Sequence, residues 1–343
     1  MKFGIFDHLD QRSEPLRKFY DDRLEYVRAV EAAGFYSYHV AEHHGTPLGM
    51  APSPNLFLSA VARETKTLRF GPLVYLLPLY HPVRLIEEIC MLDNLSGGRL
   101  DFGVGRGVSP YEVGCYGLDP KDTREMFEES LGLILRGLQA DHLDHQGKWY
   151  TVRDMPVELH PLQKPHPPLW YGVANEAGAK FCAERGMHFT TLGGTERIKG
   201  LCHSFARLWE ETRGNAHRQG SPVDTPFIGV GRHIFIADSD AEAERYARPA
   251  YEHWYASLAA LWVRHGSQPQ TGMIIPTYEE AHHLGQVVVG TPDTVRKALA
   301  AQIADVGFNY LILQIAWGTF SHEQEMRSLE LFTKEVMPAL ANL

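Results

Sequence analysis

The sequence predicts a (β/α)₈ TIM barrel that forms one domain over residues 1–343. Short apolar segments alternate with longer segments of helical periodicity, and such alternation requires parallel strands joined by right-handed crossovers. Eight strand segments, nearly all followed by a helix, fit into the chain, which favours a closed barrel over an open, doubly wound sheet. No linker divides the chain. The open sheet is the alternative that this pattern leaves.

The composition is that of a globular protein, with 44% hydrophobic and 22% charged residues. The formal net charge is −9 and no run of Lys or Arg forms a basic stripe, so nucleic acid is not an expected partner. The four cysteines are scattered without a C-x-x-C pair, which indicates reduced thiols. No segment approaches the ~20 apolar residues of a membrane span. We expect a soluble, cytoplasmic protein with no membrane partner.

The first half of the chain contains four strand–helix units. In the first helix, Leu24, Val27 and Val30 lie on one face, and Gly34 supplies a C-terminal cap. Proline stands in the first turn of the next two helices, where its missing N–H is not needed. The expected strands cover residues 2–6, 37–41, 68–77 and 100–105, and the expected helices cover 23–33, 54–65, 82–96 and 124–138.

The second half repeats the alternation less regularly. Two segments exceed normal connection lengths and are predicted to be insertions: 141–167, which is rich in His and Pro, and 265–290, which carries no strong pattern. The expected strands cover 168–174, 188–192, 233–237 and 310–315, and the expected helices cover 176–185, 195–214, 240–264, 292–305 and 322–341.

The second predicted strand ends in three titratable residues, Glu42, His43 and His44. They lie where TIM barrels carry their active sites, at the carboxyl end of a strand. Neighbouring strand residues point to opposite faces, so two adjacent histidines rarely bind one metal ion, and the chain has no H-E-x-x-H motif. We therefore expect no metal site. Two interpretations stay open, an acid–base site and a hydrated loop.

A phosphate site is predicted beside the fourth and fifth strands. Arg106 lies between Gly105 and Gly107, and glycines let backbone N–H groups approach an anion while the guanidinium forks onto it. Residues 175–177 open a helix, whose first N–H groups form a second anion position. Arg124, at the start of another helix, is a third candidate. A tight turn and an exposed helix arginine are the alternative interpretations.

Seven segments are similar, in order and spacing, to the bacterial luciferase-like flavin monooxygenases, and the resemblance covers essentially the whole chain. The block over 77–107 is the most specific. The resemblance implies a (β/α)₈ barrel that uses reduced FMN, delivered by a separate flavin reductase that binds transiently, and reacts with O₂ through a peroxyflavin. The segments are MKFGIF, AEHHG, LPLYHPVRLIEEICMLDNLSGGRLDFGVGRG, AERG, HWY, VGTPDTV and LFTKEVMP.

The resemblance also implies roles for single residues. His43 matches the catalytic histidine of the family, and the peptide between Leu73 and Val74 matches a non-prolyl cis bond beneath the flavin ring. The retained histidine argues against a non-catalytic flavin-binding subunit, which is one alternative. A deazaflavin-dependent dehydrogenase of the same superfamily is the other. The implied phosphate contacts are Arg106 and Arg124, with Asn175, Glu176 and Ala177 as a backbone cradle.

The substrate pocket is expected to be largely aromatic, although each of its residues has core packing as an alternative role. A small apolar aldehyde, ketone or terpenoid is the default substrate. Gly105 stands where the light-emitting luciferase subunit has a cysteine, so light emission is not expected as the natural role. Proteins of this family usually pair, which implies a homodimer. The expected pocket residues are Phe6, His8, Tyr75, Tyr111 and Trp254.

Overall fold

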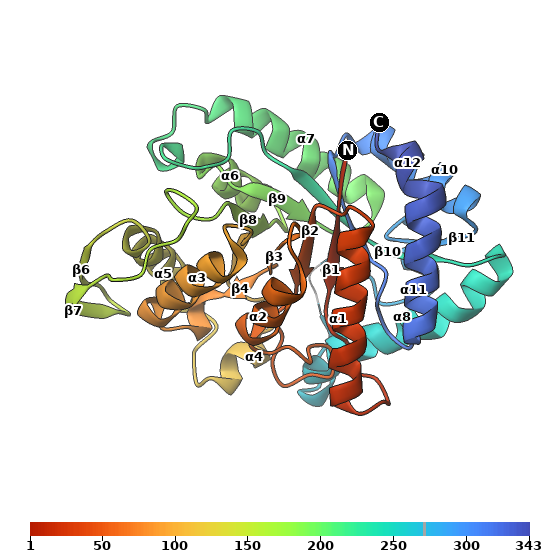
Figure 1. Ribbon diagram of the computed structural model, residues 1–343, viewed down its shortest axis with the longest axis horizontal. Coiled ribbons are helices and arrows are strands. Elements are labelled where there is room, and N and C mark those ends of the chain that lie inside the picture. The colour runs from red at the N-terminus through yellow and green to blue at the C-terminus, as the bar shows by residue number, and fades with distance from the viewer. Residues whose placement is uncertain (270–271) are drawn as a thin grey trace.

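The strands form a barrel, and the helices pack around it (Figure 1). The structure is a computed structural model that describes residues 1–269 and 272–343. Residues 270 and 271, which fall in the second predicted insertion, lie outside the described residues. The barrel strands are β1 (Lys2–Asp7), β2 (Ser37–Val40), β3 (Arg69–Pro72), β4 (Tyr75–Leu76), β5 (Phe102–Gly105), β8 (Leu169–Gly172), β9 (His188–Thr191), β10 (Ile228–Ile236) and β12 (Tyr310–Gln314).

The sheet is parallel throughout, and its two ends meet through an interrupted strand. The strand order is β3-β2-β1-β12-β10-β9-β8-β5-β4. The third predicted strand is divided into β3 and β4, and the peptide bond between Leu73 and Val74 that separates them is cis. Phe70 of β3 forms a parallel bridge with Leu100, just before β5. The predicted barrel is confirmed, with β3 and β4 counted as one of its eight strands.

The helices lie on the outside of the barrel, and α4 and α8 lie at the end where the strands finish (Figure 1). Pro54 and Pro82 stand in the first turns of α2 and α3, and Gly97 caps α3 with a φ of 69°. Among the described residues, no helix is both long and apolar enough to cross a membrane. The helices are α1 (Leu16–Ala32), α2 (Pro54–Glu64), α3 (Pro82–Ser96), α4 (Pro110–Cys115), α5 (Thr123–Gly137), α6 (Glu176–Glu184), α7 (Thr195–Glu211), α8 (Asp240–Arg264), α9 (Tyr278–His283), α10 (Pro292–Val306), α11 (His322–Leu331) and α12 (Met337–Leu340).

Both predicted insertions contain regular structure that the sequence analysis did not foresee. The first holds an antiparallel hairpin of β6 (His142–Gln146) and β7 (Thr151–Pro156), at the left edge of the view in Figure 1. The second holds α9 and a further strand, β11 (Val287–Gly290), which pairs with the carboxyl-terminal part of β10, residues 233–236. Three consecutive β-branched valines explain β11, since such residues pack well on a sheet.

Aromatic side chains fill the barrel interior near the amino ends of the strands. Trp170, Tyr310 and Ile312 form a buried cluster, and the ring nitrogen Nε2 of His39 lies 3.0 Å from the Tyr310 hydroxyl. Gly4 makes room for this cluster, because a Cβ at that position would overlap the ring of Tyr310. The carboxyl half of the barrel is left open for a cavity.

Candidate active site

A cavity of about 370 Å³ lies at the carboxyl ends of the strands, where TIM barrels carry their active sites. Ten of the thirteen predicted site residues line it and three do not. The ten are Phe6, His8, His43, Leu73, Val74, Arg106, Arg124, Asn175, Ala177 and Trp254, and the three are Tyr75, Tyr111 and Glu176.

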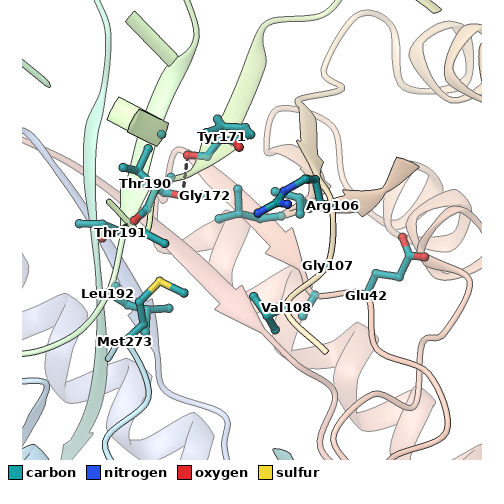
Figure 2. Close-up of a pocket in the computed structure, with 18 of the residues that line it drawn as sticks. Glu42, Arg106, Gly107, Val108, Tyr171, Gly172, Thr190, Thr191, Leu192 and Met273 are labelled. Carbon is teal, nitrogen blue, oxygen red and sulfur yellow. Dashed lines mark hydrogen bonds between the residues drawn. The ribbon is translucent and has the colours of Figure 1, made fainter. Parts of the chain in front are cut away.

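Two guanidinium groups line one side of the cavity. Arg106 is exposed and makes no hydrogen bond or ion pair with any residue that the structure describes. Figure 2 shows it extending from the segment after β5 toward Tyr171 and Gly172. Arg124, on α5, donates from Nε to Glu128 at 3.2 Å and remains largely exposed. Both guanidinium groups act electrostatically on Tyr171 and line the same cavity. Two such groups can bind a phosphate, because each offers N–H donors in a planar fork.

The first turn of α6 lies beside these guanidinium groups. Asn175 caps the helix, and its side-chain oxygen accepts the N–H of Gly178 at 3.0 Å. The N–H groups of Glu176 and Ala177 have no partner within the helix, as in any first helical turn, and a helix N-terminus favours anions. The Glu176 side chain hydrogen-bonds Ser204 instead of lining the cavity. Only the backbone of Glu176 is therefore available to a ligand.

A short stretch of backbone between β3 and β4 forms another wall of the cavity. Leu73 and Val74, joined by the cis bond, both line it, as the resemblance implies. The neighbouring strand β5 can approach so closely because it carries glycines: a Cβ on Gly103 would overlap the carbonyl of Pro72, and one on Gly105 would overlap Val74. The wall at 72–74 is thus positioned by close packing against β5.

Glu42 fixes this wall from the adjacent strand. Its carboxylate is buried and accepts hydrogen bonds from the N–H of Leu76 at 3.1 Å and the hydroxyl of Tyr80 at 2.9 Å. It also lies 2.9 Å from Nε2 of His44, whose Nδ1 lies 2.9 Å from the hydroxyl of Tyr116. Burial raises the pKa of Glu42 although these partners favour its charged form. The sequence left the role of Glu42 open. The carboxylate hydrogen-bonds His44, and not His43, among the described residues.

His43 is held by a carboxylate from a different part of the chain. Its Nδ1 lies 3.0 Å from Oε1 of Glu112, and 14% of its side-chain surface is exposed. Burial alone would lower the pKa of His43, but the charge and hydrogen bond of Glu112, with Glu42 and Asp10 further away, raise it above the ordinary histidine value. The Nε2 nitrogen is left for a ligand in the cavity.

Glu112 was not predicted, although the sequence contains a signal around it. Ser109 and Glu112 have the S-x-x-E spacing of a capping box, in which both side chains normally bond the helix backbone. Ser109 does so, accepting the N–H of Glu112 at 3.3 Å. The carboxylate of Glu112 instead bonds His43. A capping residue whose carboxylate turns away from its own helix is available for a second role.

The loop after β1 places a second imidazole beside His43. The ring of His8 stacks 5.6 Å from that of His43 and lies 5.9 Å from that of Trp254. Burial, and then the neighbouring His43 and His233, hold the pKa of His8 well below its ordinary value. The surroundings thus favour the neutral form of His8, whereas Glu112 favours the charged form of His43.

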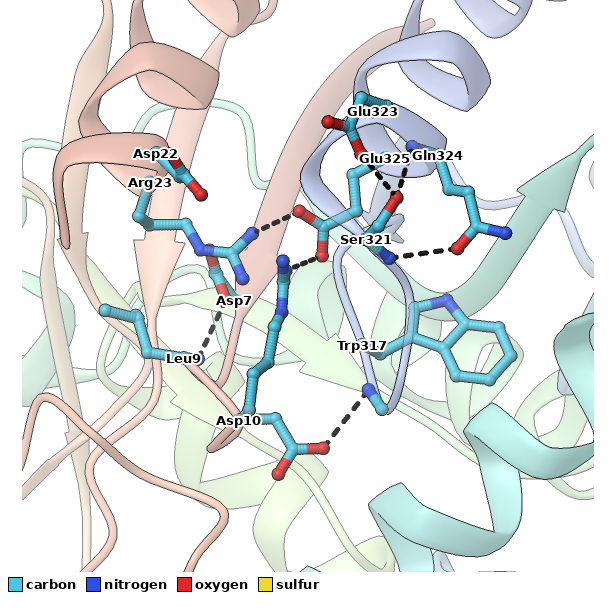
Figure 3. Close-up of polar contacts among 12 residues, drawn as sticks. Asp7, Leu9, Asp10, Asp22, Arg23, Trp317, Ser321, Glu323, Gln324 and Glu325 are labelled. Atoms are coloured by element: carbon cyan, nitrogen blue, oxygen red, sulfur yellow. Dashed lines mark hydrogen bonds and ion pairs between the residues drawn. The ribbon is translucent and has the colours of Figure 1, made fainter. Parts of the chain in front are cut away.

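A buried group of charges holds the loop that carries His8 (Figure 3). Arg23 of α1 lies 3.3 Å from Asp7 and 3.2 Å from Glu325 of α11. The same Asp7 accepts the N–H of Leu9 at 2.8 Å, so both neighbours of His8 are fixed. Asp10 accepts the N–H of Gly318 at 3.1 Å. Because these contacts join α1, α11 and the loop, they set the position of the His8 ring.

Two predicted pocket residues lie outside the cavity. Tyr75 is fully buried, and its hydroxyl donates to Asn55 of α2, so its ring lies between the barrel and the outer helices. The ring of Tyr111 stacks on His265 at 4.4 Å, and its hydroxyl lies 2.7 Å from that of Ser267. Each hydroxyl already has a partner away from the cavity, and their placement in the pocket was wrong.

Two further cavity residues, on β10 and β12, were not among the predicted site residues. His233 is on β10, two positions after Gly231, and both face the cavity because alternate strand residues share a face. Gln314 ends β12 and also lines the cavity. A polar residue at the carboxyl end of an otherwise apolar strand was the available signal for Gln314.

The comparisons with known proteins agree with this geometry. The family model described as luciferase-like monooxygenase matches residues 1–310. The protein y4wF of Sinorhizobium fredii is 36% identical, over 98% of this chain and 96% of its own length. The oxygenase component of a flavin-dependent trigonelline monooxygenase from Acinetobacter baylyi is 26% identical, over 99% of this chain and 96% of its own.

A solved structure has the same fold over almost its full length. It is the oxygenating constituent of 3,6-diketocamphane monooxygenase from Pseudomonas putida, a type II Baeyer–Villiger monooxygenase in complex with FMN. It superposes with a TM-score of 0.80 at 24% identity and covers 98% of each chain. With a family match over more than 300 residues and this barrel beneath it, the chain belongs to the luciferase-like monooxygenase family.

Proposed function

We propose that this chain is the oxygenase of a two-component monooxygenase, which uses reduced FMN and O₂ to oxygenate a small organic substrate. The observation that carries the proposal is the layout of one cavity. Arg106, unpaired among the described residues, lies on the side of β5, and His43, backed by Glu112, lies on the side of β2. FMN has a matching layout, since its phosphate and its reactive ring are at different ends of the molecule.

The residues present fit FMN. Arg106 and Arg124 would hold the phosphate together with the free N–H groups of Glu176 and Ala177, and the wall at 73–74 would support the ring. When bound in its reduced form, FMN supplies the electrons that activate O₂. Riboflavin lacks the phosphate, so the arginines predict a preference for FMN over riboflavin.

His43 would hold and move a proton at its Nε2 atom. The bond from Nδ1 to Glu112 fixes the ring orientation, and the charge of Glu112 raises the pKa of His43 and so favours the charged form of the ring. A positioned imidazole can then donate a hydrogen bond to a developing negative charge and give up or regain a proton. The apolar side chains of Val74, Leu258 and Ile274 line the same cavity and limit the access of water.

A separate reductase would supply the reduced FMN by diffusion. The naming of the Acinetobacter relative as an oxygenase component supports this proposal. The homodimer implied by the resemblance stays a prediction, which light scattering in solution tests.

Isotope labelling tests the function directly. Purified protein is given chemically reduced FMN, ¹⁸O₂ and a panel of small aldehydes, cyclic ketones, hydroxyketones, cyclic amides and terpenoids, and products are examined by mass spectrometry. One ¹⁸O atom in a product, with O₂ consumed in proportion, is the expected result. Product formation with a deazaflavin and without O₂ would identify a dehydrogenase, and FMN binding with no product from the panel would favour a non-catalytic subunit.

A further inference from the structure

Three buried polar side chains on the side of β10 and β12 lack partners. Both ring nitrogens of His233, Nε1 of Trp254 and Oε1 of Gln314 have no hydrogen-bond partner among the described residues. Each of these side chains is at least 98% buried, and each lines the cavity. Buried polar groups are paired in more than about 90% of cases, and an unpaired one costs about 1–3 kcal/mol. The unpaired atoms lie just behind one cavity wall, and they therefore indicate a ligand that draws these side chains toward it and pairs with them.

These side chains lie next to the proposed proton-transfer site. The ring of His233 is 4.4 Å from that of Trp254, which is 5.9 Å from that of His8. His8 in turn stacks on His43 at 5.6 Å. In barrel order β12 is four strands from β5, so this wall faces the side on which Arg106 lies. A molecule bound here would lie across the cavity from the proposed phosphate site. Only the ring of His8 lies between Trp254 and His43 in this series of ring contacts.

The hydrogen-bonding capacity of the wall defines the ligand. Trp254 can only donate, the free oxygen of Gln314 can only accept, and a neutral imidazole does one with each nitrogen. Burial holds the pKa of His233 at about 3, so its ring is neutral. A ligand that satisfies this wall must both accept and donate. A hydrocarbon does neither, and a simple ketone or aldehyde only accepts.

The charges around the cavity exclude an anionic ligand at this wall. The lining residues include two arginines, Arg106 and Arg124, and both lie on the opposite side. Around His233 the nearest rings are those of Trp254, Trp317 and Tyr251, which carry no charge. The charge of Arg232 acts on His233, but Arg232 does not line the cavity, and its guanidinium donates to Gln302 and to the carbonyl of Gly193. A carboxylate would therefore lack an ion-pair partner within the cavity at this wall, and burying it would be costly.

We propose, on the basis of the proposed function, that His233, Trp254 and Gln314 form the substrate-recognition wall for a neutral ring compound that carries a carbonyl next to an N–H or O–H, such as a cyclic amide or a hydroxyketone. The carbonyl oxygen accepts from Trp254 and His233, and the N–H or O–H donates to Gln314 or to the free nitrogen of His233. The hydrocarbon part of the ring packs on Leu258 and Ile274. The class of substrate is thus narrower and more polar than the sequence alone predicts.

Direct binding tests the wall without any oxygenation. The probes are 2-piperidone, which has a carbonyl and an N–H, N-methyl-2-piperidone, which lacks the N–H, and cyclohexanone. Calorimetry on the protein with oxidised FMN present should give about tenfold tighter binding of 2-piperidone than of either other probe, the usual worth of satisfying a buried partner. Equal affinities for the three probes would overturn the proposal.

Variants identify the atoms responsible. His233→Phe and Gln314→Leu should each reduce the preference for 2-piperidone to within about twofold while cyclohexanone still binds. Tyr251→Phe is the matched control: its ring lies 5.5 Å from that of His233, but its hydroxyl already donates to the carbonyl of Ile275, so the preference should persist. Two independent variants keep the test decisive if one fails to fold, which the melting temperature reveals.

The outcomes separate this inference from the proposed function. A clear probe preference in a protein that incorporates no ¹⁸O would support the wall and contradict the monooxygenase. Incorporation of ¹⁸O without any probe preference would support the monooxygenase and contradict the proposed wall. A loss of FMN affinity in both variants, with the probe preference unchanged, would assign the wall to the flavin ring and overturn the inference.

Discussion

The Nδ1 atom of His43 lies 3.0 Å from Oε1 of Glu112, a contact between residues 69 positions apart in the sequence. The carboxylate of Glu112 is buried and has no other hydrogen-bond partner among the described residues. It joins the loop after β2 to the first turn of α4, and it decides which nitrogen of His43 faces the cavity. The pair therefore links the position of α4 to the protonation of His43.

Replacing Glu112 with Gln should lower the pKa of His43. The amide keeps an acceptor near Nδ1 but removes the negative charge that favours the imidazolium. NMR titration of the His43 ring measures the change, with the exposed Glu128→Gln as control. Because its pKa is raised by folding, His43 stabilises the folded protein at pH values below its unfolded pKa of about 6.5. This stabilisation is lost as the pH rises through the folded pKa. An unchanged pKa in the Gln variant would contradict the pairing.

Replacing His43 with Ala should leave FMN affinity nearly intact and reduce turnover by about 10²–10⁴-fold, the usual contribution of positioned acid–base catalysis. His44→Ala is the matched control, because His44 bonds Glu42 and Tyr116 and does not line the cavity. It should lower the melting temperature more than turnover per folded molecule. Equal turnover in wild type and His43→Ala would remove His43 from the mechanism.

Arg106→Ala should weaken the binding of FMN far more than that of riboflavin. A charge-assisted hydrogen bond contributes about 1.5–3 kcal/mol, or roughly one to two decades in affinity. Riboflavin has no phosphate, so it does not make this bond and its affinity should not change. Arg124→Ala should have a smaller effect, because Glu128 already shares that guanidinium. Flavin fluorescence titration measures both ligands. Equal losses for FMN and riboflavin would mean that Arg106 supports the loop and not the phosphate.

The parts of the fold that the sequence predicted are those with strong local patterns. Apolar strands and capped helices are recognisable without tertiary information, and the barrel followed from their alternation. The β6–β7 hairpin was missed because its strands are polar and mostly exposed, and they are stabilised mainly by pairing with each other. β11 was missed because four residues after a long irregular segment give a weak signal.

The candidate site was predictable where a residue immediately follows a strand, as His43 and Arg106 do. Tyr75 was misplaced because successive side chains of a continuous strand point to alternate faces, and the interruption between β3 and β4 breaks this alternation. Glu112 and His233 were missed for a different reason. Their importance depends on which side chains lie opposite them, and such contacts between distant residues are not encoded in any local pattern.

Asp10 gives a prediction for stability that is independent of the cofactor. Its side chain lies in the group of buried charges shown in Figure 3, and it is 2% exposed. Burial raises its pKa to about 7, although hydrogen bonds from Ser257 and Gly318 and the charges of Arg12 and Arg23 act in the opposite direction. In the unfolded chain the same carboxyl has a pKa of about 3.9.

Between these two pKa values the folded protein holds a proton that the unfolded chain has released, so the free energy of unfolding falls as pH rises through this window, by at most about 1.4 kcal/mol per pH unit. Asp10→Asn removes the titration while keeping an oxygen that can accept the N–H of Gly318. Urea unfolding from about pH 5 to about pH 8 should therefore show the variant gaining stability relative to wild type as pH rises. Asp144→Asn, an exposed carboxylate of the hairpin, should follow the wild-type curve. Parallel curves for wild type and Asp10→Asn would show that Asp10 is ionised in the folded protein, and that Arg12 and Arg23 outweigh its burial.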